Sequence, residues 1–354
     1  MRVLFAPDYR AGNPYQQMLA DALRDHSIQT EFLSDYRRLL PLWRGVKDFD
    51  CDLLHLHWPE KYYQRRGDGI DLLRRLRYPT DLRLALRRLP LVFTAHDLLP
   101  HNRAGESFLQ SNYQYTLNRA KVVFAHSSAA AAALSKTYRF DDRKCRVIPH
   151  GDLAKSGLHL PNRIVSRDLL GLPQDEAICL MFGRVEPYKG IEEVIRWWVK
   201  RESVTLAIVG EPISLQYSNR IRDLAHASSR VRLCLEWQSG EQLRNWLAAV
   251  DCALFNYSAI LTSGAASEAR SYGVPILLPH RLSTIDLMEP HPRVFRFNTM
   301  ESDFDTSLHQ ALAVGHSYEG AREWRELTSW RKVAQATSEC YRSLMNAERA
   351  SRAE

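Results

Sequence analysis

The stretch FGRVEPYKGIEEVI, residues 182–195, joins an apolar run to a helical pattern. The apolar run, residues 177–182, ends at a glycine, and apolar residues at helical spacing follow. Two cations, Arg184 and Lys189, lie in the junction, beside the positive end of the predicted helix. Cations are unfavourable there unless an anion lies among them, so the stretch predicts a strand-to-helix turn that binds a diphosphate.

Short apolar runs separated by helical patterns recur along the whole chain. The predicted strands are residues 2–6, 29–33, 52–57, 91–94, 122–125, 146–148, 177–182, 205–209, 231–235, 252–255 and 274–278. Such strands, alternating with helices, are typical of parallel sheets that are covered on both faces. The expected fold class is therefore α/β, with two facing Rossmann-like doubly wound domains and a ligand cleft between them.

The chain of 354 residues is long enough for two domains of ordinary size. A stretch rich in glycine, leucine and polar residues, 151–162, indicates the join. We expect a first domain over residues 1–160 and a second over residues 161–323. A long helical pattern over residues 324–347 is expected to cross back and complete the first domain.

The composition, 45% hydrophobic and 25% charged, is typical of a globular protein. No apolar run approaches the roughly 20 residues of a membrane span, and the N-terminus has no pattern of a cleavable signal. We therefore expect a cytoplasmic location. The six cysteines are scattered and form no CxxC, which favours reduced, buried thiols over disulfides or a zinc site.

The net charge of +7 comes from the first half of the chain. Residues 1–160 contain 25 basic and 17 acidic residues, and residues 61–90 alone contain nine basic and three acidic residues. Leucines and tyrosines are interleaved with these basic residues. The segment could lie on an anionic membrane, with its apolar side chains inward. It could equally form solvated helices whose leucines face the core, or a nucleic-acid surface.

A second anion-binding pattern is NYSAILTSGAASEARSYGVPIL, residues 256–277. Thr262, Ser263 and Gly264 stand between a predicted strand and a helix, and Glu268 lies about one turn into that helix. Hydroxyls and free amides at a helix N-terminus can cradle an anion, and a carboxylate one turn later can bind the hydroxyls of a ribose. The alternative for the two hydroxyl residues is plain N-capping.

Polar side chains also follow a strand in TAHDLLPHNR, residues 94–103. His96, Asp97 and His101 cluster there. Such a group can orient sugar hydroxyls or accept a proton from an attacking hydroxyl. Asp97 could instead cap the turn that follows.

Two further motifs stand at strand ends. In HLHWPE, Trp58 offers a flat apolar face for a sugar ring and Glu60 a possible base, whereas His55 could be a buried strand residue. In AGNPYQQML, Gly12 and Asn13 form a turn at the first strand-to-helix junction, expected at the cleft. A purely structural turn is the alternative there.

Several enzyme classes lose support because their motifs are absent from the sequence. It contains no P-loop lysine motif, no GxGxxG after the first strand, no HExxH, no GxSxG and no paired CxxC. Nucleotide hydrolysis, hydride transfer, zinc catalysis and serine-hydrolase chemistry are therefore disfavoured.

The motifs together resemble those of the GT-B glycosyltransferases, in particular the family-4-like enzymes. VIPHG (residues 147–151), FGRVEPYKG and SEARSYGVPIL match that superfamily in order and spacing, over nearly the whole chain. LLHLHWPE, HDLLPHN and LTSG are similar to the β-mannosyltransferase group of xanthan-type exopolysaccharide assembly.

The resemblance implies a role for each candidate residue. The implied donor-binding residues are Arg184, Lys189, Thr262, Ser263, Gly264, Glu268 and, beside the nucleobase, Trp237. The implied catalytic residues are Asp97, His96 and Glu60, and the implied acceptor-binding residues are Gly12, Asn13, Trp58 and His101. No metal or other cofactor is expected, because fixed cations and a helix terminus can meet the charge on the leaving diphosphate.

One departure from the family pattern concerns stereochemistry. Retaining family-4 enzymes carry two glutamates eight positions apart, and here Ile260 occupies the first position while Glu268 occupies the second. Retention of configuration therefore does not carry over. An inverting reaction needs a base, for which Asp97 is the first choice and Glu60 the second.

We therefore expect a glycosyltransferase that moves a hexose from GDP-mannose or UDP-glucose to a lipid-linked oligosaccharide in exopolysaccharide or other surface-polysaccharide biosynthesis. It would work in the cytoplasm, at the anionic inner face of the cell membrane, without nucleic acid. Two other interpretations are a GT-B-fold sugar-nucleotide epimerase and a basic nucleic-acid-binding protein. The sequence leaves the donor, the linkage and the oligomeric state open.

Overall fold

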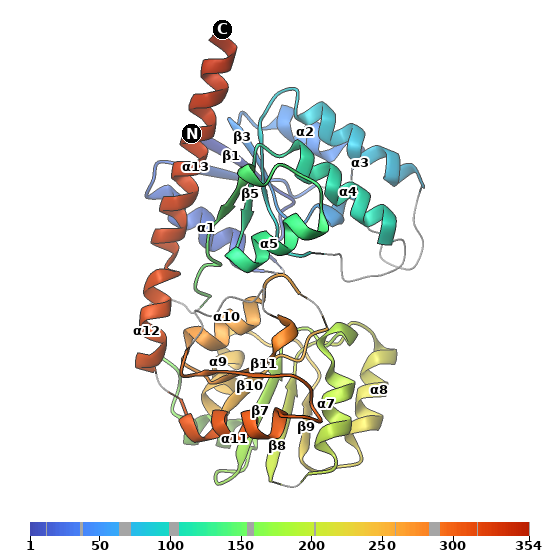
Figure 1. Cartoon of the computed structure of the whole chain (residues 1–354), viewed down its shortest axis with the longest axis vertical. Coiled ribbons are helices and arrows are strands. Elements are labelled where there is room, and N and C mark those ends of the chain that lie inside the picture. Colours follow the sequence, from blue (N-terminus) through green and yellow to red (C-terminus); the bar gives the residue numbers. More distant parts are fainter. Residues whose placement is uncertain are drawn as a thin grey trace. The chain divides into compact units, whose positions relative to one another are not determined.

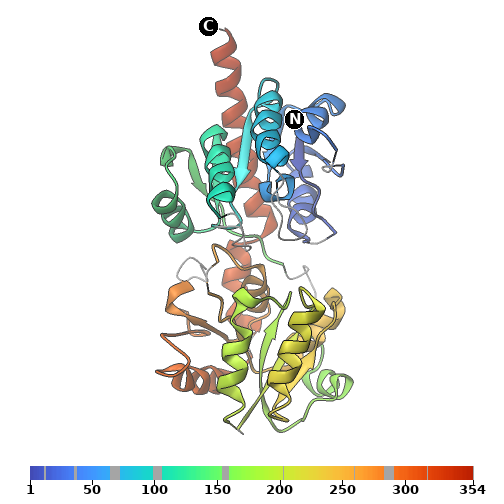
Figure 2. The same cartoon turned by 90° about the vertical axis from the view of Figure 1, so that its right-hand side faces the viewer.

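The computed structural model describes residues 1–11, 13–35, 38–63, 72–98, 106–153, 159–201, 203–258, 260–282, 291–316 and 318–353. The chain forms two compact units. The first contains Met1–Gly151 and Thr328–Glu354, and the second contains Asp152–Leu327. Each is an α/β domain with one parallel sheet and helices on both of its faces (Figures 1 and 2).

The sheet of the first domain has the strand order β2-β1-β3-β4-β5-β6. Its strands are β1 (Arg2–Ala6), β2 (Gln29–Phe32), β3 (Leu53–Leu56), β4 (Leu91–Thr94), β5 (Val122–Ala125) and β6 (Cys145–Val147). Its helices are α1 (Tyr15–Arg24), α2 (Pro41–Asp48), α3 (Leu72–Ala85), α4 (Glu106–Arg119), α5 (Ser128–Thr137) and α13 (Trp330–Ala353).

The second sheet has the strand order β12-β11-β10-β7-β8-β9. Its strands are β7 (Ala177–Phe182), β8 (Val204–Val209), β9 (Val231–Cys234), β10 (Cys252–Leu254), β11 (Ile276–Pro279) and β12 (Val294–Phe297). Its helices are α6 (Arg163–Leu170), α7 (Ile191–Trp198), α8 (Leu215–Ala225), α9 (Gly240–Ala249), α10 (Gly264–Ser271), α11 (Phe304–Val314) and α12 (Tyr318–Leu327). The sequence missed β12, and the strand predicted over residues 274–278 starts two residues later.

Strand β7 shows how the two faces of the second sheet become buried. Ile178, Leu180 and Phe182 point into a core with α9 and α10, whereas Cys179 and Met181 point into a core with α7, α8 and α11. Side chains alternate between the faces of a strand, so a strand covered on both faces is apolar throughout. The predicted doubly wound architecture of each domain is confirmed; the facing of the two domains stays a prediction.

The C-terminal helical pattern is two helices rather than the single predicted helix over 324–347. Helix α12 ends at Leu327, and α13 begins at Trp330 and packs against α1 in the first domain. The Trp330 ring occupies the space beside Gly151, where a Cβ atom would lie 2.3 Å from it. The first domain ends at Gly151 and the second begins at Asp152, nearer the N-terminus than the predicted boundary at 160.

All six cysteines are free, as predicted, but only Cys179 and Cys252 are fully buried. The other four are half-buried: Cys145 and Cys234 lie at strand ends, Cys51 precedes β3, and Cys340 lies within α13. In the described part of the chain, no helix combines the length and the apolar character that crossing a membrane requires.

Candidate active site

The candidate donor site lies at the carboxyl edge of the second sheet, between β7 and β10. These strands are neighbours, and the sheet continues through β8 and β9 on one side and through β11 and β12 on the other. Ligands of doubly wound sheets bind at such a switch point. The segments after the two strands carry Lys189 and Tyr257, so these segments are the expected donor contacts.

Glycines allow close backbone approach at this edge. Gly210, after β8, has φ +140°, and a Cβ atom there would lie 2.1 Å from the carbonyl oxygen of Gly183. Gly190 has φ +67°, and its Cβ would lie 2.4 Å from the carbonyl oxygen of Asn256. Only glycine fits these two positions. The backbone at the switch point is therefore tightly packed.

Lys189 is a buried cation at this edge. The residue is 6% exposed, and Nζ donates to the carbonyl oxygen of Phe182 at 2.9 Å. Burial lowers the pKa of Lys189 to about 8, opposed by the smaller effect of the Glu186 carboxylate. An ammonium group has three hydrogens to donate, and within the described residues only one of them is accepted. An anion at this edge would therefore be stabilised by Lys189.

Arg184 is placed differently from Lys189. Its side chain is 58% exposed, and its Nε lies 3.0 Å from Oε1 of Glu186. The expected pair of cations is thus one buried lysine and one exposed arginine with a carboxylate partner. The arginine must share its hydrogen-bonding capacity between Glu186 and any diphosphate.

Helix α10 begins near this edge with a capped N-terminus. Ser263 is the N-cap, and its Oγ accepts a hydrogen bond from the amide of Ala266 at 3.1 Å. The capping interpretation of this hydroxyl is therefore confirmed. Gly264 is the first helical residue, and Thr262 precedes the cap, half-buried. An anion-binding role for the three residues stays a prediction.

Glu268 lies one turn into α10 and is half-buried. Burial, with a smaller effect from the nearby Asp152 carboxylate, raises the pKa of Glu268 to about 7. Asp152 itself is paired with Arg325, whose Nε lies 2.8 Å from Oδ2. At neutral pH Glu268 can therefore either donate or accept a proton, which suits hydrogen bonding to sugar hydroxyls.

Sequence analysis did not predict the hydrogen bonds that hold the segment after β10. Asn256 donates through Nδ2 to Glu193 at 2.9 Å and accepts through Oδ1 from Arg281 at 2.6 Å. Arg281 also donates to the carbonyl oxygen of Tyr257 at 3.0 Å. These bonds fix the segment after β10 against α7 and the end of β11.

Trp237 lies in the loop after β9, at the same edge of the sheet, and is 69% exposed. The neighbouring Gln238 accepts a hydrogen bond from the indole of Trp246 at 3.2 Å, which ties the loop to α9. An exposed aromatic ring on a tied loop can stack on a nucleobase. The base-binding role of Trp237 stays a prediction.

In the first domain, one histidine follows each of four neighbouring strands. His57, His96, His126 and His150 come after β3, β4, β5 and β6, and their rings surround Tyr15 at centroid distances of 5.9, 4.9, 5.5 and 5.0 Å. Sequence analysis missed His126 and His150, although each follows an apolar run. No group of three or more His, Cys, Asp or Glu side chains could hold a metal ion in the described part of the chain.

A chain of hydrogen bonds joins three of these rings. Nδ1 of His126 lies 2.9 Å from the carbonyl oxygen of Ile148, and Nε2 of His126 lies 3.4 Å from Nδ1 of His96. Nε2 of His96 lies 3.1 Å from Nδ1 of His57. Burial is the largest cause that lowers the pKa of all three rings, so each is neutral at pH 7.

The carbonyl group of Ile148 sets the tautomer of every ring in this chain. It can only accept, so His126 carries its hydrogen on Nδ1 and accepts at Nε2 from His96. His96 then accepts at Nε2 from Nδ1 of His57, whose buried Nε2 has no partner among the described residues. Both ring nitrogens of His96 are thus engaged. The catalytic role of His96 stays a prediction.

Trp58 packs flat on the ring of His96, with the centroids 4.2 Å apart and 12° between the planes. Tyr9 lies 4.9 Å from the indole, and Trp58 is only 8% exposed. Little of the ring is open to a ligand in this structure. The prediction that Trp58 binds a sugar ring therefore requires a movement of its neighbours.

Asp97 and Glu60, the predicted bases, follow β4 and β3 at the same carboxyl edge. The backbone carbonyl of Asp97 accepts a hydrogen bond from the hydroxyl of Tyr113 at 2.6 Å, and Glu60 lies in the single-turn helix Pro59–Tyr62. Both residues have further interactions within the described chain. Their catalytic roles stay predictions.

Of the remaining candidate residues, two have structural roles and two lie outside the described residues. His55 is fully buried and bonds to Tyr341 and Thr94, which confirms the strand-residue interpretation. Oδ1 of Asn13 accepts from the amide of Tyr15 at 2.9 Å, as in a structural turn. Gly12 and His101 lie outside the described residues.

This chain has the GT-B fold, and solved structures match it over nearly its whole length. Sucrose-phosphate synthase of Thermosynechococcus elongatus matches with a TM-score of 0.77 and 17% identity over 98% of this chain and 99% of that one. Anabaena HepE in complex with UDP-glucose matches with a TM-score of 0.71 and 17% identity over 97% of this chain and 100% of that one.

Sequence comparison identifies the activity class. The family model Glycosyltransferase Family 4 matches residues 3–152, and this chain is a glycosyltransferase. A curated relative is the GDP-mannose:glycolipid 4-beta-D-mannosyltransferase of Xanthomonas campestris pv. campestris. It is 27% identical over 310 residues, which cover 84% of this chain and 78% of that protein.

Proposed function

We propose that this glycosyltransferase moves a mannosyl group from GDP-mannose to a lipid-linked oligosaccharide during assembly of an exopolysaccharide or another surface polysaccharide. The observation that carries the proposal is the similarity, over 84% of the chain, to a GDP-mannose:glycolipid 4-beta-D-mannosyltransferase. UDP-glucose is the second candidate donor, because a structure of the same fold binds it. The second domain would hold the donor and the first the acceptor.

The donor site would work without a metal ion. Negative charge grows on the diphosphate as the sugar leaves, and Lys189, Arg184 and the N-terminus of α10 would stabilise it. Glu268 would bind the ribose and Trp237 would border the nucleobase. The base that takes the proton of the acceptor hydroxyl would be Asp97 or, failing that, Glu60, because both ring nitrogens of His96 are already bonded.

A thermal-shift panel of GDP-mannose, UDP-glucose, GDP and UDP tests the donor. A ligand that binds only the folded protein at 100 times its Kd adds about 2.7 kcal/mol of stability, a shift of several degrees. We expect GDP-mannose and GDP to raise Tm more than the uridine nucleotides do. Equal shifts by UDP-glucose and UDP would contradict the choice of nucleotide, and no shift by any of the four would contradict the donor site.

We also propose that the enzyme contacts the anionic inner face of the membrane through basic residues near α3. The apolar side chains Tyr78, Leu82 and Ala85 are buried, so the described part of this segment cannot insert them into lipid as the sequence suggested. Arg83, Arg87 and Arg88 are exposed. The contact would therefore be electrostatic rather than an amphipathic insertion.

Binding to vesicles of phosphatidylglycerol and phosphatidylethanolamine tests the membrane contact. Changing Arg83, Arg87 and Arg88 to Gln should weaken binding about 100-fold, at about 1 kcal/mol for each residue. The matched control changes Lys200, Arg222 and Arg232, which are exposed in the second domain. Equal loss in the two triple variants would show a general charge effect and overturn the proposed surface.

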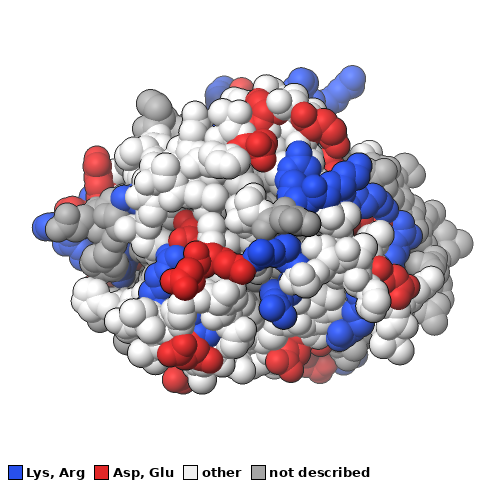
Figure 3. All heavy atoms as spheres, turned by 90° about the horizontal axis from the view of Figure 1, so that it is seen from below, with Lys and Arg blue, Asp and Glu red and all other residues white. Residues whose placement is uncertain are grey.

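The face of the molecule shown in Figure 3 gives no support to nucleic-acid binding. On the face shown in Figure 3, a group of basic side chains is accompanied by acidic side chains rather than forming an uninterrupted basic stripe. A basic stripe along one face is the usual footprint of nucleic-acid binding.

A further inference from the structure

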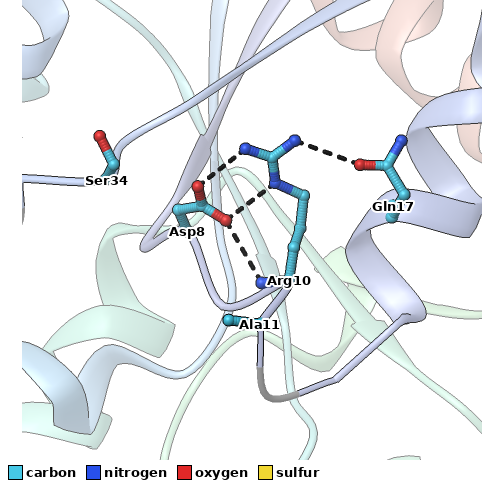
Figure 4. A pocket seen from close by; sticks show the side chains of 5 residues that line it. All are labelled: Asp8, Arg10, Ala11, Gln17 and Ser34. Carbon is cyan, nitrogen blue, oxygen red and sulfur yellow. Dashed lines mark hydrogen bonds and ion pairs between the residues drawn. The ribbon is translucent and has the colours of Figure 1, made fainter.

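A pocket of about 320 Å³ opens at the carboxyl ends of β1 and β2 in the first domain (Figure 4). It is lined by Asp8, Arg10, Ala11, Gln17 and Ser34. The first three follow β1, Ser34 follows β2, and Gln17 belongs to α1. Because β1 lies between β2 and β3, the pocket lies about one to two strand spacings, roughly 5–10 Å, from the segment after β3 along the same edge.

Arg10 is held in one orientation in this pocket. Its Nε and Nη2 each donate to the Asp8 carboxylate at 2.9 Å, and its Nη1 donates to Oε1 of Gln17 at 3.1 Å. The guanidinium carbon also lies 3.7 Å from the centroid of the Phe32 ring. A guanidinium group has five hydrogens, and these bonds use three of them. The other two have fixed directions.

The charge of this arginine is already compensated. The hydrogen bond from Arg10 is the main cause that lowers the pKa of Asp8, so both groups are ionised at neutral pH. An anionic ligand would meet a cation and an anion together and gain little. A hydroxyl group gains from both, because it donates to the carboxylate and accepts from the guanidinium. The exposed hydroxyl of Ser34 can serve a second hydroxyl in the same way.

We propose that this pocket binds one uncharged sugar ring of the acceptor glycan, away from the reacting hydroxyl. The Asp8–Arg10 pair would bind neighbouring ring hydroxyls, and Phe32, beneath the guanidinium, would keep the pair rigid. This inference rests on the proposed function, in which the first domain binds the acceptor. A rigid pair contributes more affinity than a mobile one, because less side-chain entropy is lost on binding.

Ligand-observed NMR titration with cellobiose as the neutral probe, and glucuronic acid as the acidic one, tests the pocket. Arg10→Ala should weaken cellobiose binding about tenfold, because charge-assisted hydrogen bonds to the sugar are lost. Arg143→Ala is a matched control. Arg143 makes the same two bonds to Asp141, two residues earlier, at 2.9 and 3.1 Å, but in the turn before β6.

Each outcome of the titration supports or overturns the proposed sugar site. Equal loss of cellobiose binding in both variants, or no loss in either, overturns the proposal that this pocket binds a sugar ring. If glucuronic acid binds more tightly than cellobiose, the pocket does not prefer an uncharged sugar and is an anion site instead. The titration contains no nucleotide, so Arg10-dependent cellobiose binding without any GDP-mannose shift would refute the proposed donor and leave the pocket standing.

Discussion

Replacing Lys189 by methionine is expected to lower the rate of sugar transfer by about 100- to 1,000-fold, the usual cost of removing one fixed partner of a charge that develops in the reaction. Lys189 is 6% exposed, and its ammonium group lies beside the carbonyl oxygen of Phe182. Methionine keeps much of the length and apolar character of the stem but removes the charge. The measurement is kcat/KM for GDP-mannose, together with the Kd of GDP.

The pH dependence of GDP binding gives this prediction a second readout. The pKa of Lys189 in the unliganded protein is about 8, so its ammonium form is lost as the pH rises through that value. GDP affinity of the wild type should therefore fall above pH 8, and that of Lys189→Met should show no such step. Bound diphosphate favours the ammonium form and moves the step upward.

A folding defect should not be the cause of the lower transfer rate of Lys189→Met. Burying an ammonium group is costly, so its replacement by an apolar side chain should leave the stability unchanged or raise it. Lys200→Met, at an exposed position just after α7, is the control for losing a positive charge from the same domain. A rate for Lys189→Met within threefold of the control would refute the diphosphate role.

Most strands of the two sheets could be predicted from the sequence because each is a short apolar run. A strand that is buried on both faces is apolar at every position, as in β7, and this can be read without knowing its partners. Strand β12 was missed because Arg296 interrupts its apolar run. The break between α12 and α13 was missed because Thr328 and Ser329 are compatible with a continuous helix pattern.

The candidate donor site was predicted at the level of the segment but not of the contacts. Glycines and lysine at a strand-to-helix junction placed Lys189 correctly after β7. The partner of Arg184 is only two residues away, yet rotamers decide whether such neighbours meet. The bonds from Asn256 to Glu193 and Arg281 join residues at sequence separations of 63 and 25, which no local pattern reveals.

The histidine cluster could have been found from the sequence with one more step. His57, His96, His126 and His150 each stand at the end of a predicted strand or one or two residues after it. Had the order β3-β4-β5-β6 been assumed, the parallel arrangement would have placed all four along one edge. The direction of the hydrogen bonds could not have been found, because it depends on the carbonyl group of Ile148.

Lowering the pH from 6.5 to 5.5 is expected to destabilise the first domain by about 4 kcal/mol, about 1 kcal/mol for each of its four buried histidines. His55, His57, His96 and His126 have pKa values held below the ordinary 6.5, mainly by burial. The unfolded chain therefore binds more protons than the folded domain below pH 6.5. Stability is present above that pH and is lost as the pH falls toward the folded-state values.

In the second domain the effects of Glu268 and of His316, whose pKa is lowered to about 4 mainly by burial, have opposite signs and nearly cancel. Its stability should therefore change little between pH 6.5 and 5.5, which makes the experiment specific. The pKa of Glu268, in the second domain, is raised to about 7, so protonation there stabilises the folded state as the pH falls through 7. Hydrogen-exchange mass spectrometry, corrected for intrinsic exchange rates, resolves peptides of β3 to β5 from those of α10. Ordinary carboxylates stay ionised above pH 5.5 and contribute little.

His126→Gln identifies the hydrogen-bonded chain as the source of the acid sensitivity. The amide of glutamine can donate and accept hydrogen bonds but cannot take up a proton. Its first domain should lose about 1 kcal/mol less than the wild type between pH 6.5 and 5.5. His26→Gln, a change in the turn after α1, should leave the wild-type slope intact. If the first domain of the wild type keeps its stability down to pH 5.5, its buried rings are not neutral, and the tautomers assigned from Ile148 are wrong.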